Sequence, residues 1–350
     1  SAVSRGLGDV YKRQISNKKQ VFDIKKLQRN LDYNFDFIEN SKVNLSSNNK
    51  FSFSLINKKK IDKFELKSKI NFDEIKFKKN LNLPININNG ELKLDYKNHI
   101  FDINVNSKIY FLSDEKKQPN LGDAKFLISK KKNENIKFKG NFSNKGNKIN
   151  SDQIKEIINI DNKLIPSQDL QFDSNNSIEF EFNKKNKIEK YKLNSNLKIS
   201  KLEISHNGSN LKRFLPEYKD IIIFKDNLIE INLNNKIKDI KLKGLYSLNN
   251  NLSDSYKINL IQNSEILDFD ANINLHNLFL NFKSIDYKKN KKINSNLIIK
   301  GRYKDDLKFN QIEYKENLNT IQASNIILSK KYKIKNLSLI HISEPTRHCT

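Results

Sequence analysis

The sequence has almost no cysteine and little glycine, proline or arginine. Its single cysteine is Cys349, so no disulfide can form within the chain. Nine dispersed glycines are a poor basis for a phosphate-binding loop, and no dinucleotide or nucleophile motif is found. Arginine, the usual bidentate reader of bases, occurs only six times in 350 residues. These shortages disfavour a disulfide framework, a nucleotide-binding enzyme and a sequence-specific DNA-binding protein.

Long apolar runs are also missing. No stretch approaches the roughly 18 apolar residues of a membrane helix, and residues 221–224 are among the longest apolar runs. Hydrophobic residues make up 36% of the chain, which is lean for a packed globule of this size. The 22 Phe and 12 Tyr residues nevertheless argue against a disordered chain. A sheet with only one apolar face fits this supply.

The formal net charge of +25 comes almost entirely from lysine. Lysine, asparagine and isoleucine are the residues that A/T-rich coding sequence supplies, and the lysines are spread along polar faces and turns. We interpret the charge as a solvated, compositionally biased surface. A functional basic surface is the alternative, and for it anionic lipid headgroups are better partners than DNA, so no specific nucleic acid is expected.

Both ends of the chain differ in composition from the interior. They hold half of the arginines, two of the five histidines and the only cysteine. The pieces SRGLGDVYKRQ and SLIHISEPTR resemble translated sequencing-adaptor sequence. We therefore predict a metagenomic fragment with a foreign lead at residues 1–14 and a foreign tail at 340–350. Both are expected to be poorly packed and are left out of the fold prediction.

Alternation of apolar and polar residues dominates the interior and is clearest from 281 to 339. Because successive residues of a strand point to opposite faces, Leu297, Ile299 and Tyr303 share one face with Ser295. The residues between them take the other face. Turns are predicted at 46–50 and at Asn88-Asn89-Gly90, where a hairpin would reverse the chain.

The pattern predicts a mainly β protein: an elongated, curled antiparallel sheet of groove-like repeat architecture with one or two short helices. Residues 15–150 form a first β-sheet segment and 221–339 a second. Residues 151–220 hold short helices and connecting strands. One helix is expected after Ser151, where Ile154, Ile157 and Ile158 recur at helical spacing, and a second around 211–218.

No constellation of residues predicts catalysis. His99, His206 and His276 are isolated, without a second ligand nearby for a metal. Glu179 and Glu181 stand together on the polar face of a strand and are interpreted as sheet-surface charge. We therefore expect no enzyme activity, no catalytic residue, no metal site and no cofactor.

Three segments carry a family resemblance. They are NGELKLDYKNHIFDINVNSKI, then LKRFLPEYKD followed by NLIEINLNNKIKDIKLKG, and the stretch from SIDYKKNKKINSNLIIKG to YKIKNLSLI. Together they resemble the middle of the AsmA-like superfamily, most closely its YhdP-type members and more distantly TamB. The resemblance covers most of residues 15–339.

The resemblance implies a long β-sheet curled into a groove, anchored in the inner membrane by an N-terminal helix and crossing the periplasm of a Gram-negative cell. It implies transport of phospholipid to the outer membrane, with phospholipid acyl chains as partners and membranes contacted through terminal regions that this fragment lacks. No functional residue carries over, because the activity that the resemblance implies is a property of the groove as a whole.

The residue pattern supplies candidates for the lining of such a groove: Phe101, Ile103, Val105, Ile229, Ile231, Leu233, Leu297 and Ile299. The same alternation fits a second reading, in which two sheets close on each other. The protein would then be a structural or adhesive β-sandwich or β-solenoid of the cell surface with no lipid transport.

Overall fold

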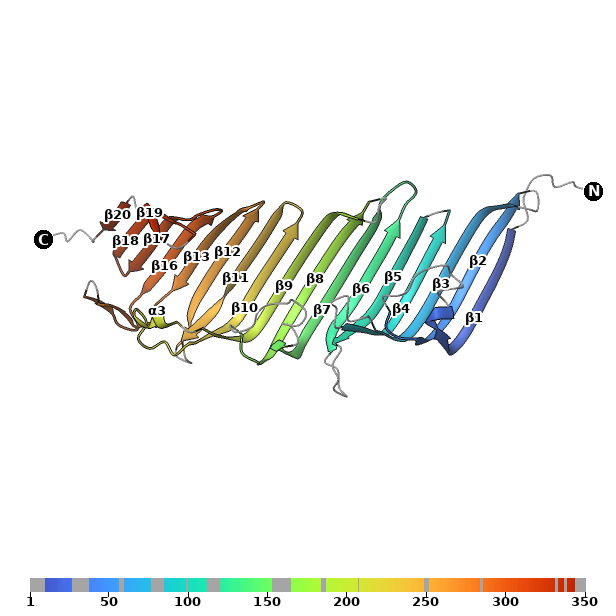
Figure 1. Cartoon of the computed structure of the whole chain (residues 1–350). Helices are drawn as coiled ribbons and strands as arrows, with labels where there is room; N and C mark the ends of the chain where they lie inside the picture. The colour runs from blue at the N-terminus through green and yellow to red at the C-terminus, as the bar shows by residue number, and fades with distance from the viewer. Residues whose placement is uncertain are drawn as a thin grey trace, which may run out of the picture. The chain divides into compact units, whose positions relative to one another are not determined.

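The protein is mainly β in the computed structural model, which confirms the predicted antiparallel class. Among the described residues, eighteen strands form one antiparallel sheet, and two further strands form a separate hairpin (Figure 1). In the part of the chain that is described, no helix has the length and apolar character to cross a membrane. The structure describes residues 10–26, 38–56, 60–76, 85–98, 100–111, 120–152, 165–183, 187–206, 208–248, 252–283, 286–330, 333–336 and 339–343.

The chain divides into two compact units. Unit 1 comprises residues 1–147, 156–158 and 175–192. Six antiparallel pairings join its first seven strands in sequence order, from β1–β2 to β6–β7. These strands are β1 (Val10–Asp23), β2 (Lys42–Ile56), β3 (Lys60–Lys76), β4 (Ile85–Lys97), β5 (Ile100–Phe111), β6 (Asn120–Lys130) and β7 (Ile136–Asn150), followed by part of β8 (Asp169–Phe182) and of β9 (Ile188–Ser205).

Unit 2 comprises residues 148–155, 159–174 and 193–350 and follows the same plan. The hairpin of β14 (Leu280–Phe282) and β15 (Tyr287–Lys289) interrupts the series, so β13 pairs with β16. Both final strands pair with β18. The elements are α3 (Ser209–Lys212), β10 (Ile221–Asn234), β11 (Ile237–Leu248), β12 (Asp254–Asn263), β13 (Ile266–Asn274), β16 (Ser295–Tyr303), β17 (Leu307–Glu316), β18 (Asn319–Leu328), β19 (Ile334–Asn336) and β20 (Leu339–Ser343).

Unit 2 has a buried core where the segment from 275 to 282 packs on the sheet. Two of its tyrosine hydroxyls donate hydrogen bonds at 2.7 Å to backbone carbonyls, Tyr218 to His206 and Tyr246 to Asn274. Burial of the rings is therefore compatible with their polar ends. We call this core the tyrosine cluster; its members are Tyr218, Tyr246, Leu248, Tyr256, Leu275, Leu278 and Leu280.

The predicted turns at 46–50 and 88–90 are wrong, because β2 and β4 run straight through them. In β4 the local backbone does have the expected left-handed residue, but it is Asn89, with φ of 50°. The strand accommodates it as a bulge between Asn88 and Glu91. Gly90 serves a different need: the Phe72 ring on β3 lies where a Cβ would be.

Parts of both ends, which were left out of the fold prediction, lie in strands: residues 10–14, which are exposed, and residues 340–343. Residues 10–14 are part of β1 and pair with β2, from Val10 opposite Ser54 to Gln14 opposite Lys50. Residues 340–343 lie in β20, where Ile340 is opposite Ala323. A strand is held by backbone hydrogen bonds that any extended sequence can make, so unusual composition does not prevent pairing.

The predicted helices have different outcomes. Only Ser151 and Asp152 of the first are described, and both are helical; Ile154, Ile157 and Ile158 lie outside the described residues. The second exists as α3, which is shorter than the predicted range and is followed by turns up to Tyr218. The proposed division at residues 150 and 220 stays a prediction.

Candidate functional site

The predicted groove residues near position 100 lie on one face of β5 in unit 1. Phe101, Ile103 and Val105 are half-buried, and the residues between them are exposed. The register places Ile103 opposite Leu94 of β4 and Ile128 of β6. Because directly opposite residues point to the same side of a sheet, these three side chains form an apolar row across three strands.

Further apolar side chains extend this face on both sides. Val105 lies opposite Leu92 of β4 and Phe126 of β6. The Phe138 ring of β7 lies 5.7 Å from the Phe126 ring and 5.9 Å from the Phe180 ring of β8, centre to centre. The apolar face of unit 1 therefore reaches from β4 to β8.

Unit 2 carries a longer row that joins two of the predicted residues, Ile229 and Ile299. Cross-strand partners connect them through β11, β12 and β13, and the row continues onto β17 and β18. All of its side chains are half-buried, and two of them, Leu242 and Ile258, also pack against the tyrosine cluster. The row consists of Ile229, Leu242, Ile258, Ala271, Ile299, Ile312 and Ala323.

The other three predicted residues of unit 2 have different surroundings. Ile231 begins a neighbouring apolar row with Ile240 of β11. Leu233 lies opposite Lys238 of β11, so a charged side chain interrupts its row on the next strand. Leu297 packs against the tyrosine cluster. Ile231 and Ile299 are therefore better placed than Leu233 and Leu297 to contact a ligand on this face.

On the apolar side of the sheet in unit 1, a row of polar side chains runs across β1, β2 and β3. Ser68 Oγ donates to Asn49 Oδ1 at 2.5 Å, Asn49 Nδ2 donates to Ser47 Oγ at 2.9 Å, and Ser47 Oγ donates to Asn17. The polar run at 46–50 has the composition of a turn, so this row carries no recognisable signal in the sequence. Its groups satisfy one another, which makes burial of polar atoms on this face tolerable.

The opposite face of each unit is charged. In unit 1, Lys69 and Lys93 both contact Glu91, at 2.7 Å and 2.9 Å. In unit 2, Arg302 Nε and Nη2 donate to the two carboxylate oxygens of Asp268, at 2.6 Å and 3.1 Å. Exposed pairs of this kind contribute little to stability. They keep one side of the sheet hydrated, opposite the apolar rows.

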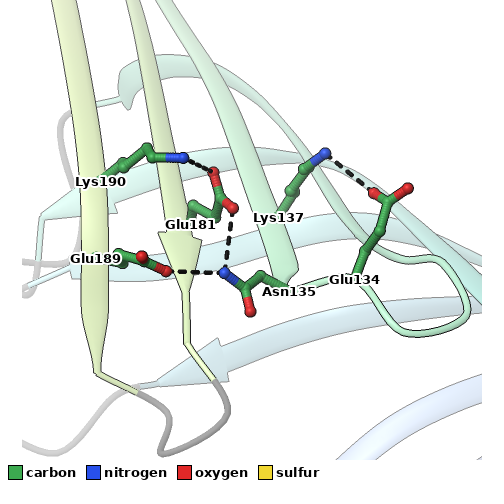
Figure 2. Close-up of polar contacts among 6 residues, drawn as sticks. All are labelled: Glu134, Asn135, Lys137, Glu181, Glu189 and Lys190. Carbon is green, nitrogen blue, oxygen red and sulfur yellow. Dashed lines mark hydrogen bonds and ion pairs between the residues drawn. The ribbon is translucent and has the colours of Figure 1, made fainter.

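Figure 2 shows part of the charged face of unit 1, where β7 begins, β8 ends and β9 begins. Asn135 Nδ2 donates to Glu181 Oε1 at 3.1 Å and to Glu189 Oε2 at 2.8 Å, and Lys190 contacts Glu181 at 3.3 Å. The hydrogen bonds from Asn135 and Lys190 lower the pKa of the Glu181 carboxyl. Glu181 is therefore part of an ion-pair network on the sheet surface, as the sequence analysis expected.

The other acidic and histidine residues considered in the sequence do not come together in one site among the described residues. Glu179 forms an ion pair with Lys139 at 3.3 Å. His206 contributes its carbonyl to the Tyr218 hydrogen bond, and His99 lies outside the described residues. Within the described ranges, no group of three or more His, Cys, Asp or Glu side chains is arranged to hold a metal ion.

Lys289 is a buried lysine that the sequence analysis did not identify. Its Nζ donates to the carbonyls of Leu275 and Leu278 at 2.7 Å, and to those of Asn290 and His276 at 3.2 Å and 3.3 Å. Burial lowers the pKa of this amine. Because the carbonyls occupy its donors, Lys289 ties the segment from 275 to 290 together and is not available as a nucleophile.

A second group at the same end of unit 2 joins two tyrosines to a carboxylate. The hydroxyls of Tyr287 and Tyr314 lie 2.8 Å apart, and both contact Glu316. Burial, together with the Glu316 carboxylate, raises the pKa of Tyr287 to about 12 and that of Tyr314 further. Tyr314 lies opposite Leu297, so this group borders the apolar face.

The sequence matches no protein-family model, and neither curated proteins nor solved structures include a detectably similar chain. Function is therefore inferred from the two faces of the sheet.

Proposed function

We propose that the apolar face of the sheet contacts phospholipid acyl chains, in a non-enzymatic protein that conducts phospholipid from the inner toward the outer membrane. The proposal extends the resemblance to AsmA-like proteins, including a periplasmic location and an inner-membrane anchor in the complete protein. The row from Ile229 to Ala323 supports it most, because its half-buried apolar side chains continue across seven strands.

The energetics of lipid transfer explain why a continuous row matters. Moving one CH₂ group of an acyl chain out of water lowers the free energy by roughly 0.8 kcal/mol. Exposing a whole chain of about 16 carbons to water therefore costs on the order of 10 kcal/mol. A face that offers apolar contact on every successive strand keeps this barrier low at each step. A strand with a polar side chain in this row would raise the barrier again at that step.

Site-specific photo-crosslinking tests the proposal. A photoreactive amino acid is placed at Phe101, Ile231 or Ile299 and irradiated in the presence of phospholipid vesicles. Lys300 is the matched control, because it is adjacent to Ile299 in β16 and points to the charged face. We expect phospholipid adducts at the three apolar positions and several-fold fewer at Lys300.

Equal labelling at Ile299 and Lys300 would refute the lipid-contacting face. Adducts to polypeptide instead of lipid at the apolar positions would support the structural or adhesive alternative, in which a protein surface covers this face.

A further inference from the structure

The charged face of unit 1 contains a lysine-rich depression of about 450 Å³ over β2, β3, β4 and β5. Four lysines line it, Lys50, Lys67, Lys69 and Lys93, with Asp95 as the acidic residue of the lining. Two asparagines, Asn48 and Asn104, complete its polar rim. A second depression of about 410 Å³ adjoins it and shares Lys50 and Lys67.

The register brings lysines directly opposite one another in this depression. Lys50 of β2 faces Lys67 of β3, and Lys69 of β3 faces Lys93 of β4. Like charges directly opposite in a sheet repel each other. An anion bound between them relieves this repulsion, so the arrangement favours a negatively charged ligand.

Local carboxylates compensate these lysines only in part. Lys69 and Lys93 share the single carboxylate of Glu91, and Lys67 lies 3.4 Å from Asp95. Among the described residues, no ion pair to Lys50 is found, and its cross-strand neighbours are Gln14 and Lys67. Positive charge is therefore in excess where the two depressions meet.

The chemistry of the lining selects phosphate groups on a surface. Lysine ammonium groups bind phosphate as point charges, and here they are exposed, with 69% of the Lys67 side chain accessible. The lining of this depression has no aromatic ring for base stacking and no arginine fork for base edges. Phe51 and Arg13 border the adjoining depression, but they lie opposite each other next to the Lys50–Gln14 pair, so their side chains point to the other face of the sheet. These features suit lipid headgroups better than nucleic acid.

We propose that this depression is a docking site for the phosphate headgroups of an anionic membrane surface. The inference is independent of the proposed acyl-chain contact, because the two faces of the sheet are opposite each other. Contact with acyl chains and docking to headgroups would therefore take place on opposite faces of the sheet.

Vesicle co-sedimentation tests the proposal with the whole chain. The variant Lys50→Gln/Lys67→Gln is compared with Lys241→Gln/Lys300→Gln, which removes the same charge from ion-paired lysines of unit 2. Each lysine near an anionic surface strengthens partition about fivefold. We expect the first variant to bind phosphatidylglycerol-containing vesicles more than tenfold more weakly, and the control to stay within about twofold of the unmodified chain.

Equal losses in the two variants would overturn the proposal, since total charge would then explain binding. Binding that is equally strong to pure phosphatidylcholine vesicles would also overturn it, and would point to the apolar face. Thermal unfolding of each variant checks the fold. Photo-crosslinking at Ile299 in the Lys50→Gln/Lys67→Gln variant keeps the two proposals distinguishable, because only the acyl-chain proposal concerns that position.

Discussion

Gly90 is constrained by a residue far away in the sequence. The Phe72 ring lies directly opposite, and a Cβ on residue 90 would approach Phe72 Cζ to 1.8 Å. Since Phe72 is a buried core residue, its ring has little room to move. We expect Gly90→Ala to lower the free energy of unfolding by about 1–3 kcal/mol, measured by urea denaturation.

A smaller residue at position 72 is the control for this clash. In a Phe72→Leu background the alanine at position 90 has more room, so its additional cost should fall clearly. An equal cost in both backgrounds would show that backbone conformation, and not the ring, makes glycine necessary at this position.

Tyr287 makes stability depend on pH in the alkaline range. Its pKa is raised to about 12 in the folded protein, against about 10 in an unfolded chain. The folded state therefore holds the proton more tightly, and the free energy of unfolding falls as pH rises from about 10 to about 12. We expect Tyr287→Phe to flatten this dependence in denaturation curves recorded across that range.

Any pH dependence of the free energy of unfolding that remains in the Tyr287→Phe variant comes from other tyrosines, because burial also raises the pKa values of Tyr246 and Tyr314. A slope identical to that of the unmodified chain would mean that Tyr287 titrates in the same way folded and unfolded.

At the scale of the strand, the bulge in β4 depends on Asn89. Its φ of 50° lies in the left-handed region, which asparagine tolerates and β-branched residues avoid. We expect Asn89→Val to destabilise unit 1 by about 1–2 kcal/mol and Asn89→Gly to be close to neutral. Thermal unfolding followed by circular dichroism measures both variants; an equal loss for Val and Gly would contradict the backbone explanation.

Alternation predicted strands well but located their ends poorly. Phe101, Ile103 and Val105 alternate strictly, and their common face follows from strand geometry alone. At residues 88–90 the same sequence signal suits a hairpin turn and a bulge, since both use a left-handed residue. The glycine itself is needed next to the Phe72 ring of β3, and no local sequence pattern contains that contact.

The candidate site was only partly predictable for a similar reason. Strand periodicity identified Ile229 and Ile299 as face residues, but their common row depends on the register of four intervening pairings. Leu233 and Leu297 have the same periodicity and yet meet Lys238 and the tyrosine cluster. Lys289 and the lysine-rich depression of unit 1 carry no local signal, because cross-strand contacts create both.

For the whole molecule, pairing between neighbouring strands predicts that a core substitution destabilises only the strands near it. Leu278 is buried in the tyrosine cluster, and Leu278→Ala should cost about 2–5 kcal/mol there. In an array where each strand contacts mainly its neighbours, stability is approximately a sum of local terms. We expect faster amide hydrogen exchange in β10–β13 and unchanged exchange in β2–β5, measured by mass spectrometry. A uniform increase throughout would indicate a single cooperative unit.

The order of pairing also bears on how the chain acquires its structure. From β2 to β7 every strand pairs with the strand that precedes it in the sequence, so the contacts are close in sequence. Topologies dominated by such contacts lose little loop entropy before they gain hydrogen bonds. A chain that emerges from its amino end can therefore add one strand at a time to a growing edge, and its nascent sheet does not have to wait for a distant partner.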